Sequence, residues 1–315
     1  MSDHTITEGP AGGRQSTLAK IAHMFRGTTD PDARVRSFYE VLDNIREDGF
    51  YREILGMEST YINYGYWADG CDDPDTACEA LADELADAAG ISEGDRVLDV
   101  GFGFAEQDFH WLRTRKPEKI SGINVTPSQV QGARRRAEAL GVADRLDLRV
   151  GSATALPFED GSFDRVVALE ASAHFDTRQK FFREALRVLR PGGVLATTDP
   201  LPRQGTVPKG GLMGRLDESR RKRVIPDANW YPRPVYEDQL RQAGYTQIQV
   251  RDITDSVLIP NAEHIRARCT RLLRDPRFSS FKQRNGIKWH LKVTELRAAS
   301  RDYVISAAWK PHDRV

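Results

Sequence analysis

The sequence lacks an excess of charge of either sign, because 46 lysine and arginine residues are matched by 46 aspartate and glutamate residues in a chain of 315. A chain without net positive charge has no general electrostatic attraction for nucleic acid or for an anionic membrane surface. We therefore predict neither of them as a partner. The hydrophobic fraction, 39%, is ordinary for a folded globular protein and is sufficient for a sizeable core.

Cysteine, long apolar runs and a secretion signal are also scarce or missing. The three cysteines, Cys71, Cys78 and Cys269, form no Cys-x-x-Cys pair, which disfavours a disulfide framework and a structural zinc site. No run reaches the ~20 apolar residues of a membrane-spanning helix. Residues 1–10 lack the basic segment and apolar run of a signal peptide. We expect a cytoplasmic protein.

Composition and periodicity divide the chain into three regions. Residues 1–16 are rich in Gly, Ser, Thr and Pro, which predicts a disordered N-terminus. Helical spacing of apolar residues predicts a helical lid over 17–90. In the core, 91–315, predicted strands alternate with helices, with cap insertions at about 201–233 and 262–300. This alternation predicts an α/β fold, a Rossmann-like doubly wound and mostly parallel sheet, here seven-stranded, with an N-terminal helical lid and an inserted helical cap.

The most informative stretch is residues 96–110. A buried strand over Val97–Val100 leads into a turn at Gly101 and Gly103, and a helix follows. Glycines let a ligand approach the backbone, and the free N–H groups at a helix start attract an anion. Asp99 could contact such a ligand or cap the turn through backbone N–H groups. The stretch predicts a cradle for a nucleotide-like ligand.

Two common nucleotide-binding motifs do not fit this turn. A dinucleotide-binding domain requires Gly-x-Gly-x-x-Gly, and Glu106 occupies the place of the third glycine. A phosphate-binding loop requires Gly-Lys followed by Ser or Thr, which is absent from the turn. The ligand must therefore be inferred from the segments that follow.

The segment from Val97 to Pro200 resembles the class I S-adenosylmethionine-dependent methyltransferases. The matching pieces occur in the family's order and spacing, at residues 97–103, 122–129, 155–164, 169–175 and 189–194. The aromatic cluster Tyr61–Trp67 is similar to the lid of the small-molecule branch, especially the macrolide and sugar O-methyltransferases of erythromycin-biosynthesis type. The resemblance implies S-adenosylmethionine as the cofactor and a small molecule as the methyl acceptor.

The resemblance also implies which residues bind the cofactor. They are Tyr61, Tyr66, Asp99, Gly101, Gly103, Gln107, Asn124, Gln129, Ser152, Ala153 and Glu170. Two positions depart from the family. Asn124 stands where an acidic residue usually holds the ribose hydroxyls, and Ser152 stands where an Asp usually binds the adenine amino group. An Asn side chain can still hydrogen-bond hydroxyls, with Gln129 assisting, and the adenine contact would pass to the Ala153 backbone or to short hydroxyls.

The candidate catalytic base is His174, which follows the fourth strand of the core. An imidazole with a pKa near neutrality is suited to take the proton of an acceptor hydroxyl. Asp199, at the end of the fifth strand, is the candidate to orient or charge-stabilise it, while Glu170 is expected to face the cofactor. No acidic pair of the kind that holds Mg²⁺ follows the strands, so we predict a metal-independent reaction.

The leading hypothesis is O-methylation of a hydroxyl on a small natural product, a polyketide or macrolide or its sugar. The alternative is a C-methyltransferase acting on an isoprenoid or sterol-like alkene, in which basic residues of 215–223 would hold a diphosphate. An NAD(P)-dependent oxidoreductase is disfavoured by Glu106 and Asn124, and a non-catalytic cofactor-binding protein is a further alternative. The acceptor pocket is expected from residues 15–70, from the 201–233 insertion and from the stretch after Ala262. An exchanged N-terminal helix or lid would be compatible with a homodimer.

Overall fold

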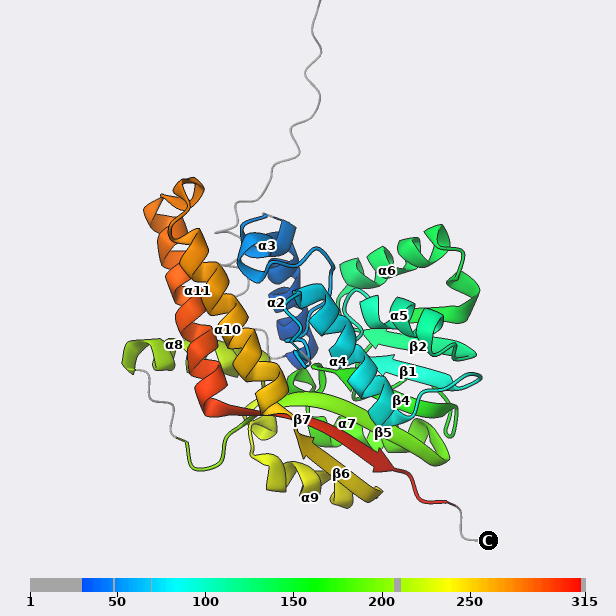
Figure 1. Ribbon diagram of the computed structural model, residues 1–315. Coiled ribbons are helices and arrows are strands. Elements are labelled where there is room, and N and C mark those ends of the chain that lie inside the picture. Colours follow the sequence, from blue (N-terminus) through cyan, green and yellow to red (C-terminus); the bar gives the residue numbers. More distant parts are fainter. Residues whose placement is uncertain (1–29, 48, 69, 207–210, 313–315) are drawn as a thin grey trace, which may run out of the picture.

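A seven-stranded sheet lies at the centre of the computed structural model, which describes residues 30–47, 49–68, 70–206 and 211–312 (Figure 1). The strand order is β3-β2-β1-β4-β5-β7-β6. The strands are β1 (Arg96–Val100), β2 (Lys119–Asn124), β3 (Leu146–Val150), β4 (Phe163–Leu169), β5 (Leu189–Pro202), β6 (Thr246–Asp252) and β7 (Arg301–Trp309). β1 to β5 pair in parallel, whereas β7 runs antiparallel to β5 and β6. The predicted fold class is confirmed, and the predicted disorder over 1–16 falls outside the described residues.

Helices cover both faces of the sheet, so successive residues of a central strand are both buried. Val97 packs in one core with α4 (Pro74–Ala89), α5 (Glu106–Thr114) and α6 (Pro127–Ala139). Its neighbour Leu98 packs in a second core with α7 (Arg178–Val188) and α9 (Arg233–Ala243). Both side chains are fully buried. This explains why β1 has a continuous apolar run around Asp99 rather than an alternating pattern.

Helix α4 belongs to the core and not to the predicted lid. Its N-cap is Asp73, whose carboxylate accepts a hydrogen bond from the Thr76 N–H at 2.8 Å, and its C-cap is Gly90 in the left-handed conformation. Leu81 and Leu85 are fully buried in the core that contains Val97. The assignment of all of 17–90 to a lid is therefore wrong. Among the described residues, α2 (Pro31–Glu47), α3 (Phe50–Leu55) and the loop that follows are the part of this region that remains outside the sheet's core, and we keep the word lid for them.

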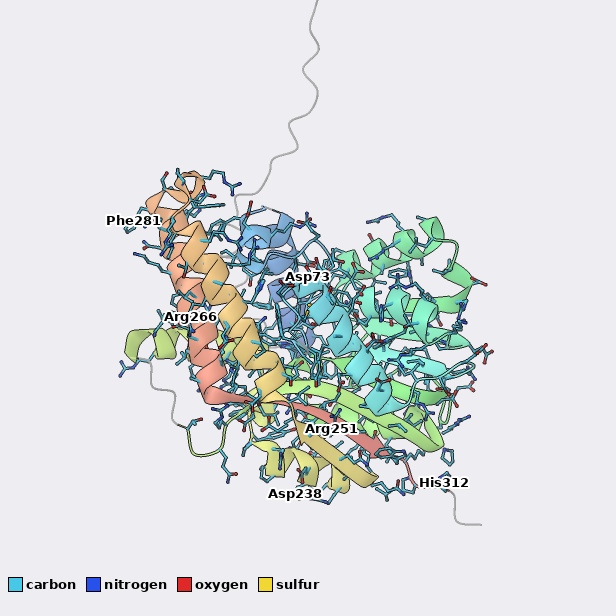
Figure 2. The ribbon with its side chains drawn as sticks, in the orientation of Figure 1. Asp73, Asp238, Arg251, Arg266, Phe281 and His312 are labelled. Atoms are coloured by element: carbon cyan, nitrogen blue, oxygen red, sulfur yellow. The ribbon has the colours of Figure 1, made fainter. Side chains whose placement is uncertain are left out.

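The predicted helical segment at 262–300 is a pair of helices, α10 (Thr254–Leu272) and α11 (Phe281–Ser300). The two lie side by side and project beyond the sheet next to α2 and α3 (Figure 1). Phe281, 84% exposed, lies at their outer end (Figure 2). Closer to the sheet, Ile265 and Ile287 pack with Ile54 of α3 in a third core. Together with α8 (Gly211–Val224), these helices surround the space above the carboxyl ends of β4 and β5.

Two positions of α9 test the assignment of its buried face. Leu240→Ala should lower the free energy of unfolding by about 2–5 kcal/mol, because it opens a cavity at a fully buried position. Val235→Ala, on the same helix but 40% exposed, should change it by about 0.5 kcal/mol or less. Denaturant titration of both variants gives the comparison, and equal effects would contradict the packing of α9 on the sheet.

Candidate functional site

Two cavities adjoin each other at the carboxyl ends of the parallel strands. The first has a volume of about 780 Å³ and the second of about 1470 Å³. Both volumes include the part of each cavity that is open to solvent. Five residues line both cavities and form what we term the shared wall: Tyr39, Tyr61, Ile62, Glu170 and His174. Any group passed from a ligand in one cavity to a ligand in the other has to cross at this wall.

The glycine turn after β1 borders the first cavity. Gly101 has φ +87°, and a Cβ there would lie 2.4 Å from the Cβ of Ala171. Gly103 has φ +58°, and its Cβ would meet only Ile62, at 3.4 Å. From the sequence, both glycines were expected to let a ligand approach the backbone. The structure adds a packing reason for Gly101, whereas Gly103 presents a side-chain-free edge to the cavity.

Asp99 supports the turn from below and does not line either cavity. It is fully buried, and its Oδ2 accepts a hydrogen bond from Gln107 Nε2 at 2.8 Å. The same amide group donates to the Phe102 carbonyl at 3.1 Å. The carboxyl of Asp108, equally buried, lies against that of Asp99, and burial raises the pKa of both. The predicted direct contact of Asp99 with the cofactor is therefore replaced by an indirect role. Asp99 positions the side chain of Gln107, and Gln107 lines the cavity.

The end of β2 offers a hydrogen-bond acceptor in place of the missing carboxylate. Asn124 Nδ2 donates to Gln129 Oε1 at 2.9 Å and to the Gly103 carbonyl at 3.2 Å. Gln129 Nε2 in turn donates to Asp43 of α2 at 3.1 Å. Because both protons of the Asn124 amide are used, Asn124 can serve a ribose hydroxyl only through its Oδ1. Both residues line the first cavity.

At the end of β3, Gly151 and Ala153 line the first cavity and Ser152 does not. The Ser152 hydroxyl lies 3.1 Å from the hydroxyl of Thr154. Ser152 is therefore removed from the residues predicted to contact the cofactor, whereas Gly151 and Ala153 border the cavity. The first cavity fits an adenosyl cofactor, since it joins the open edge at Gly103, the Oδ1 of Asn124, which accepts only a long bond of 3.4 Å from the Thr126 N–H, and the turn at Gly151 and Ala153.

The aromatic cluster at 61–67 divides between the two cavities and the core. Tyr61 lies in the shared wall, and Tyr64 and Trp67 line the second cavity. Tyr66 lines neither, and its backbone N–H donates to the Ala77 carbonyl at 2.7 Å. The structure therefore removes Tyr66 from the predicted cofactor-binding residues, because its side chain packs against the core that contains Val97.

His174 lies in the shared wall with one ring nitrogen fixed. Nδ1 lies 2.9 Å from the carbonyl oxygen of Val224, and a carbonyl only accepts, so Nδ1 carries the proton and Nε2 the lone pair. Burial lowers the pKa of His174 below its usual 6.5, which keeps the ring neutral at pH 7. The phenol ring of Tyr39 lies edge-on to the imidazole, 5.8 Å between centroids.

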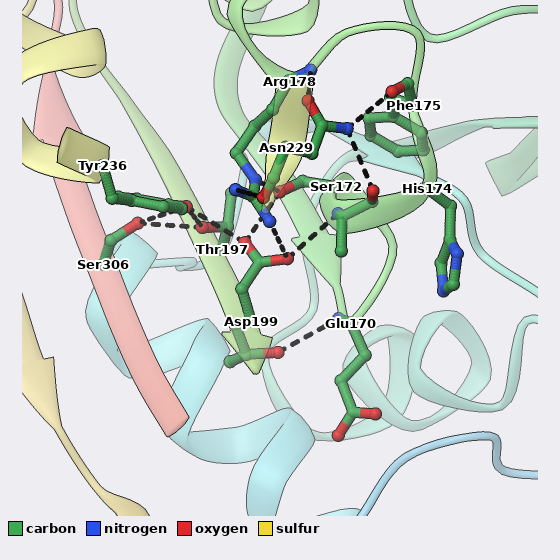
Figure 3. A network of polar contacts seen from close by, with 12 residues as sticks. Glu170, Ser172, His174, Phe175, Arg178, Thr197, Asp199, Asn229, Tyr236 and Ser306 are labelled. Carbon is green, nitrogen blue, oxygen red and sulfur yellow. Dashed lines mark hydrogen bonds and ion pairs between the residues drawn. The ribbon is translucent and has the colours of Figure 1, made fainter. Parts of the chain in front are cut away.

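The predicted pairing of His174 with Asp199 is wrong. Within the described part of the chain, Asp199 makes no hydrogen bond to the His174 ring, which extends from its turn without a contact to the carboxylate (Figure 3). Asp199 Oδ2 accepts from the Ser172 hydroxyl at 2.7 Å, and Oδ1 accepts from the Ala173 N–H at 3.1 Å. Asp199 thus positions the turn that precedes His174, and not the imidazole itself.

Arg178 neutralises Asp199 and secures the other side of the same turn. Both side chains are fully buried, and Arg178 Nη2 lies 3.5 Å from Asp199 Oδ1. Arg178 Nη1 donates to the carbonyl of Asn229 at 3.0 Å. The Asn229 amide donates to the carbonyls of Ala173 and Phe175, at 2.9 and 2.7 Å (Figure 3). The residues on both sides of His174 are therefore fixed by a buried polar network.

Glu170 reaches the shared wall from an unusual backbone conformation. Its φ is +52°, and its N–H donates to the carbonyl and the hydroxyl oxygen of Thr198, both at 3.1 Å. Its Oε1 accepts from the Tyr303 hydroxyl at 2.6 Å and from the Tyr64 N–H at 2.8 Å. Burial raises the pKa of Glu170 to about 8. Non-glycine residues at positive φ are concentrated at functional sites.

The second cavity is lined by the segments from which the acceptor pocket was expected. Side chains of the lid, of α8 and its following turn, and of α10 and α11 all contribute. Arginines dominate one part of it, where Arg297 and Arg301 share Asp217 at 2.8 and 3.3 Å. Sequence reasoning missed these arginines, as it missed Tyr39 and Tyr303, because each occupies an ordinary position of a helix or strand with no motif around it.

Comparison with known proteins agrees with this geometry. The model of a family described as methyltransferase domain matches residues 98–197. Erythromycin 3''-O-methyltransferase of Saccharopolyspora erythraea is 40% identical over 293 residues, which cover 89% of this chain and 91% of that protein. The 27-O-demethylrifamycin SV methyltransferase of Amycolatopsis mediterranei is 38% identical over 196 residues, 61% of this chain and 69% of that protein.

Solved structures support the fold at lower identity. The [4+2]-cyclase SpnF superimposes with a TM-score of 0.67 at 24% identity, covering 89% of this chain and 97% of that one. Geranyl diphosphate C-methyltransferase from Streptomyces coelicolor A3(2) gives 0.65 at 20% identity, covering 90% and 99%. A cyclase and a methyltransferase share this architecture, so these two likenesses show the fold alone.

Asp199→Asn tests the buried network. The substitution leaves the Arg178 charge without its partner and should lower the free energy of unfolding by about 3–5 kcal/mol. Adding Arg178→Met should recover part of this loss, since both charges are then gone. Asp238→Asn is the matched control, because its ion pair with Arg241 is exposed and is worth about 1 kcal/mol or less. Additive losses in the double variant, measured by denaturant titration, would contradict the pairing.

Proposed function

This chain belongs to the S-adenosylmethionine-dependent methyltransferases, and we propose that it methylates a hydroxyl group of a small natural product, a polyketide or macrolide or its sugar, with His174 as the general base. The observation that carries the proposal is the shared wall, in which a neutral imidazole lies between two cavities of suitable size. The 40% identity to erythromycin 3''-O-methyltransferase over most of both chains supports this acceptor class.

The first cavity is assigned to the cofactor S-adenosylmethionine, which supplies a methyl group activated on its sulfonium when bound. Gly103 gives the ligand an open edge, and Gln107 is held at the start of α5 by Asp99. The Oδ1 of Asn124 would accept a hydrogen bond from a ribose hydroxyl, and Gly151 and Ala153 would border the adenine ring. Gln129 links this side of the cavity to α2 of the lid.

His174 removes the proton of the acceptor hydroxyl through Nε2. The Val224 carbonyl holds the Nδ1 proton, so the lone pair of Nε2 is the one available to the substrate. The buried network of Asp199 and Arg178 holds the turn that carries His174, which limits the positions the ring can take. Tyr39 and Tyr61 close the wall around the imidazole and help to exclude water.

The second cavity is assigned to the acceptor. Most of its lining comes from the lid and from the helices of the cap, which lie outside residues 98–197, the segment that the family model matches. The alternative of a C-methyltransferase for a prenyl diphosphate finds little support in the basic run at 215–223. Arg221 is paired with Glu218 and Asp227, and Arg220 stacks on Trp289 at 4.2 Å. A charged diphosphate would have to displace these contacts.

No helix of the described residues is long and apolar enough to cross a membrane. A cytoplasmic location and a homodimer built through the lid stay predictions. We propose a small molecule as the methyl acceptor. We also propose that the reaction needs no metal ion.

His174→Ala should lower kcat by about 10²- to 10⁴-fold and leave the affinity for S-adenosylmethionine within about twofold, because the variant loses only the proton acceptor. The acceptor is first identified by screening macrolides and their glycosides with labelled cofactor. His264→Gln is the matched control. His264 lines only the second cavity, so its substitution should change the KM for the acceptor more than kcat.

The pH profile gives a second readout. Since the pKa of His174 is lowered from 6.5, the neutral base is present above that pH, and kcat should fall only as the pH decreases further. Full turnover by His174→Ala with unchanged cofactor affinity would sink the assignment of the base.

Removal of divalent metal should leave turnover unchanged. In the described ranges, no group of three His, Cys, Asp or Glu side chains is arranged to hold a metal ion. The measurement is the initial rate after dialysis against a chelator, with and without added Mg²⁺. A rate that falls on dialysis and returns with Mg²⁺ would replace the general-base proposal with a metal-assisted one.

A further inference from the structure

Glu170 is the only carboxylate among the described residues that lines both cavities. The catalytic scheme above assigns the acceptor's proton to His174 and gives Glu170 no task. Its position is nevertheless tightly specified, because a strained backbone and a hydroxyl donor from a distant strand both direct it to the shared wall. Such an arrangement calls for a functional explanation.

The hydrogen bonds to Glu170 leave one oxygen for a ligand. Tyr303 of β7 and the Tyr64 N–H both donate to Oε1. No described residue hydrogen-bonds to Oε2. Glu106, the other glutamate of the first cavity, differs in its charge balance, because its Oε1 is paired with the Arg136 guanidinium at 2.7 Å and accepts from the Thr60 hydroxyl at 2.6 Å. Of the two glutamates, Glu170 is the one without a cationic partner.

The groups around Glu170 do not supply a compensating positive charge. Tyr39 on α2 and Tyr303 on β7 are neutral phenols whose pKa is raised by burial, and Tyr64, in the loop after α3, presents its backbone N–H. Asp199 on β5 is negative and raises the pKa of Glu170 further, while His174 is neutral. The carboxylate form of Glu170 would therefore be stabilised by a cation that a ligand supplies.

We propose that Glu170 recognises the positive charge of the cofactor's sulfonium and thereby distinguishes S-adenosylmethionine from its neutral product, S-adenosylhomocysteine. A methyl group passed from the first cavity to the second would cross the shared wall, so the sulfonium of a bound cofactor would be held on the side that Glu170 lines. The proposal is independent of which group takes the acceptor's proton.

The proton balance follows from the burial of Glu170. In the free protein the carboxyl is mostly protonated at pH 7, since its pKa is about 8. A sulfonium beside it favours the carboxylate, so binding of S-adenosylmethionine releases the Glu170 proton to the buffer. Once the methyl group has gone and the thioether is neutral, Glu170 takes a proton back. Affinity for S-adenosylmethionine should then rise with pH up to about 8, while affinity for the product should not.

Calorimetric titration in buffers of different ionisation enthalpy counts the protons released. At pH 7 the full-length protein should release about 0.9 proton more on binding S-adenosylmethionine than Glu170→Gln does. The ligand's own amino group titrates in both proteins, so the difference isolates Glu170. With S-adenosylhomocysteine the two proteins should release equal numbers. At pH 8.5, Glu170→Gln should weaken binding of S-adenosylmethionine by about tenfold or more and binding of the product by less than about twofold.

Two further variants complete the test. Glu106→Gln is the matched control, since Arg136 and Thr60 lower the pKa of Glu106 against the effect of burial, and its proton count should equal that of the unaltered protein. Tyr303→Phe removes a hydrogen bond that lowers the pKa of Glu170, so the rise in affinity should move to higher pH. If Glu170→Gln does not fold, the pH dependence of S-adenosylmethionine affinity in Tyr303→Phe tests the proposal instead. Equal proton counts for the protein and Glu170→Gln, equal loss of both ligands, or an unmoved profile in Tyr303→Phe would overturn the proposal.

Discussion

The buried ion pair of Asp199 and Arg178 is the interaction on which the site depends. Arg178 is the first residue of α7, and Asp199 lies on the central strand β5. The guanidinium lies 5.0 Å from the ring centres of both Tyr231 and Tyr236, so aromatic faces replace the water it has lost. A buried pair of this kind contributes little net stability compared with apolar residues of the same volume. Its effect is to specify one arrangement of the turn between β4 and α7, which carries His174.

Electrostatics on the two sides of that turn are kept separate. On the inner side, the buried Asp199 is paired with Arg178 and lines neither cavity, although its charge still raises the pKa of Glu170. On the outer side, the shared wall contains a neutral histidine, neutral phenols and a glutamate whose charged form is disfavoured by burial. A wall without a fixed positive charge does not repel a cationic donor, and it does not ionise a neutral hydroxyl before the donor is bound. It also leaves the proton affinities of His174 and Glu170 sensitive to whatever is bound.

Local patterns predicted much of the fold and of the cofactor cavity. The strand, the glycine turn and the helix at 96–110 depend on neighbours in the sequence, which place Gly103 close to Gln107. Asn124 joins them because β2 pairs in parallel with β1. Asp199 was predicted to end the fifth strand, but β5 continues to Pro202, and the partner of Asp199 was not predicted. Arg178 looks in the sequence like a surface residue of a helix, and nothing local indicates that its side chain turns inward. Tyr66 and Ser152 lie in loops, where the direction of a side chain follows from the packing of the loop and not from a repeating sequence pattern.

The parts that sequence reasoning could not build are those that enclose the acceptor. Residues as distant as Tyr51, Arg221 and His290 line one cavity, and their meeting depends on how α3, α8 and α11 pack above the sheet. These helices contribute little to the main cores, which are made by the sheet and the helices that cover it. Their lining residues can therefore change without loss of the cofactor cavity or of the turn that holds His174. A fold arranged in this way keeps the cofactor cavity and the general base His174 constant while the pocket for the methyl acceptor varies. This is consistent with one architecture serving methyl transfer to different hydroxyls.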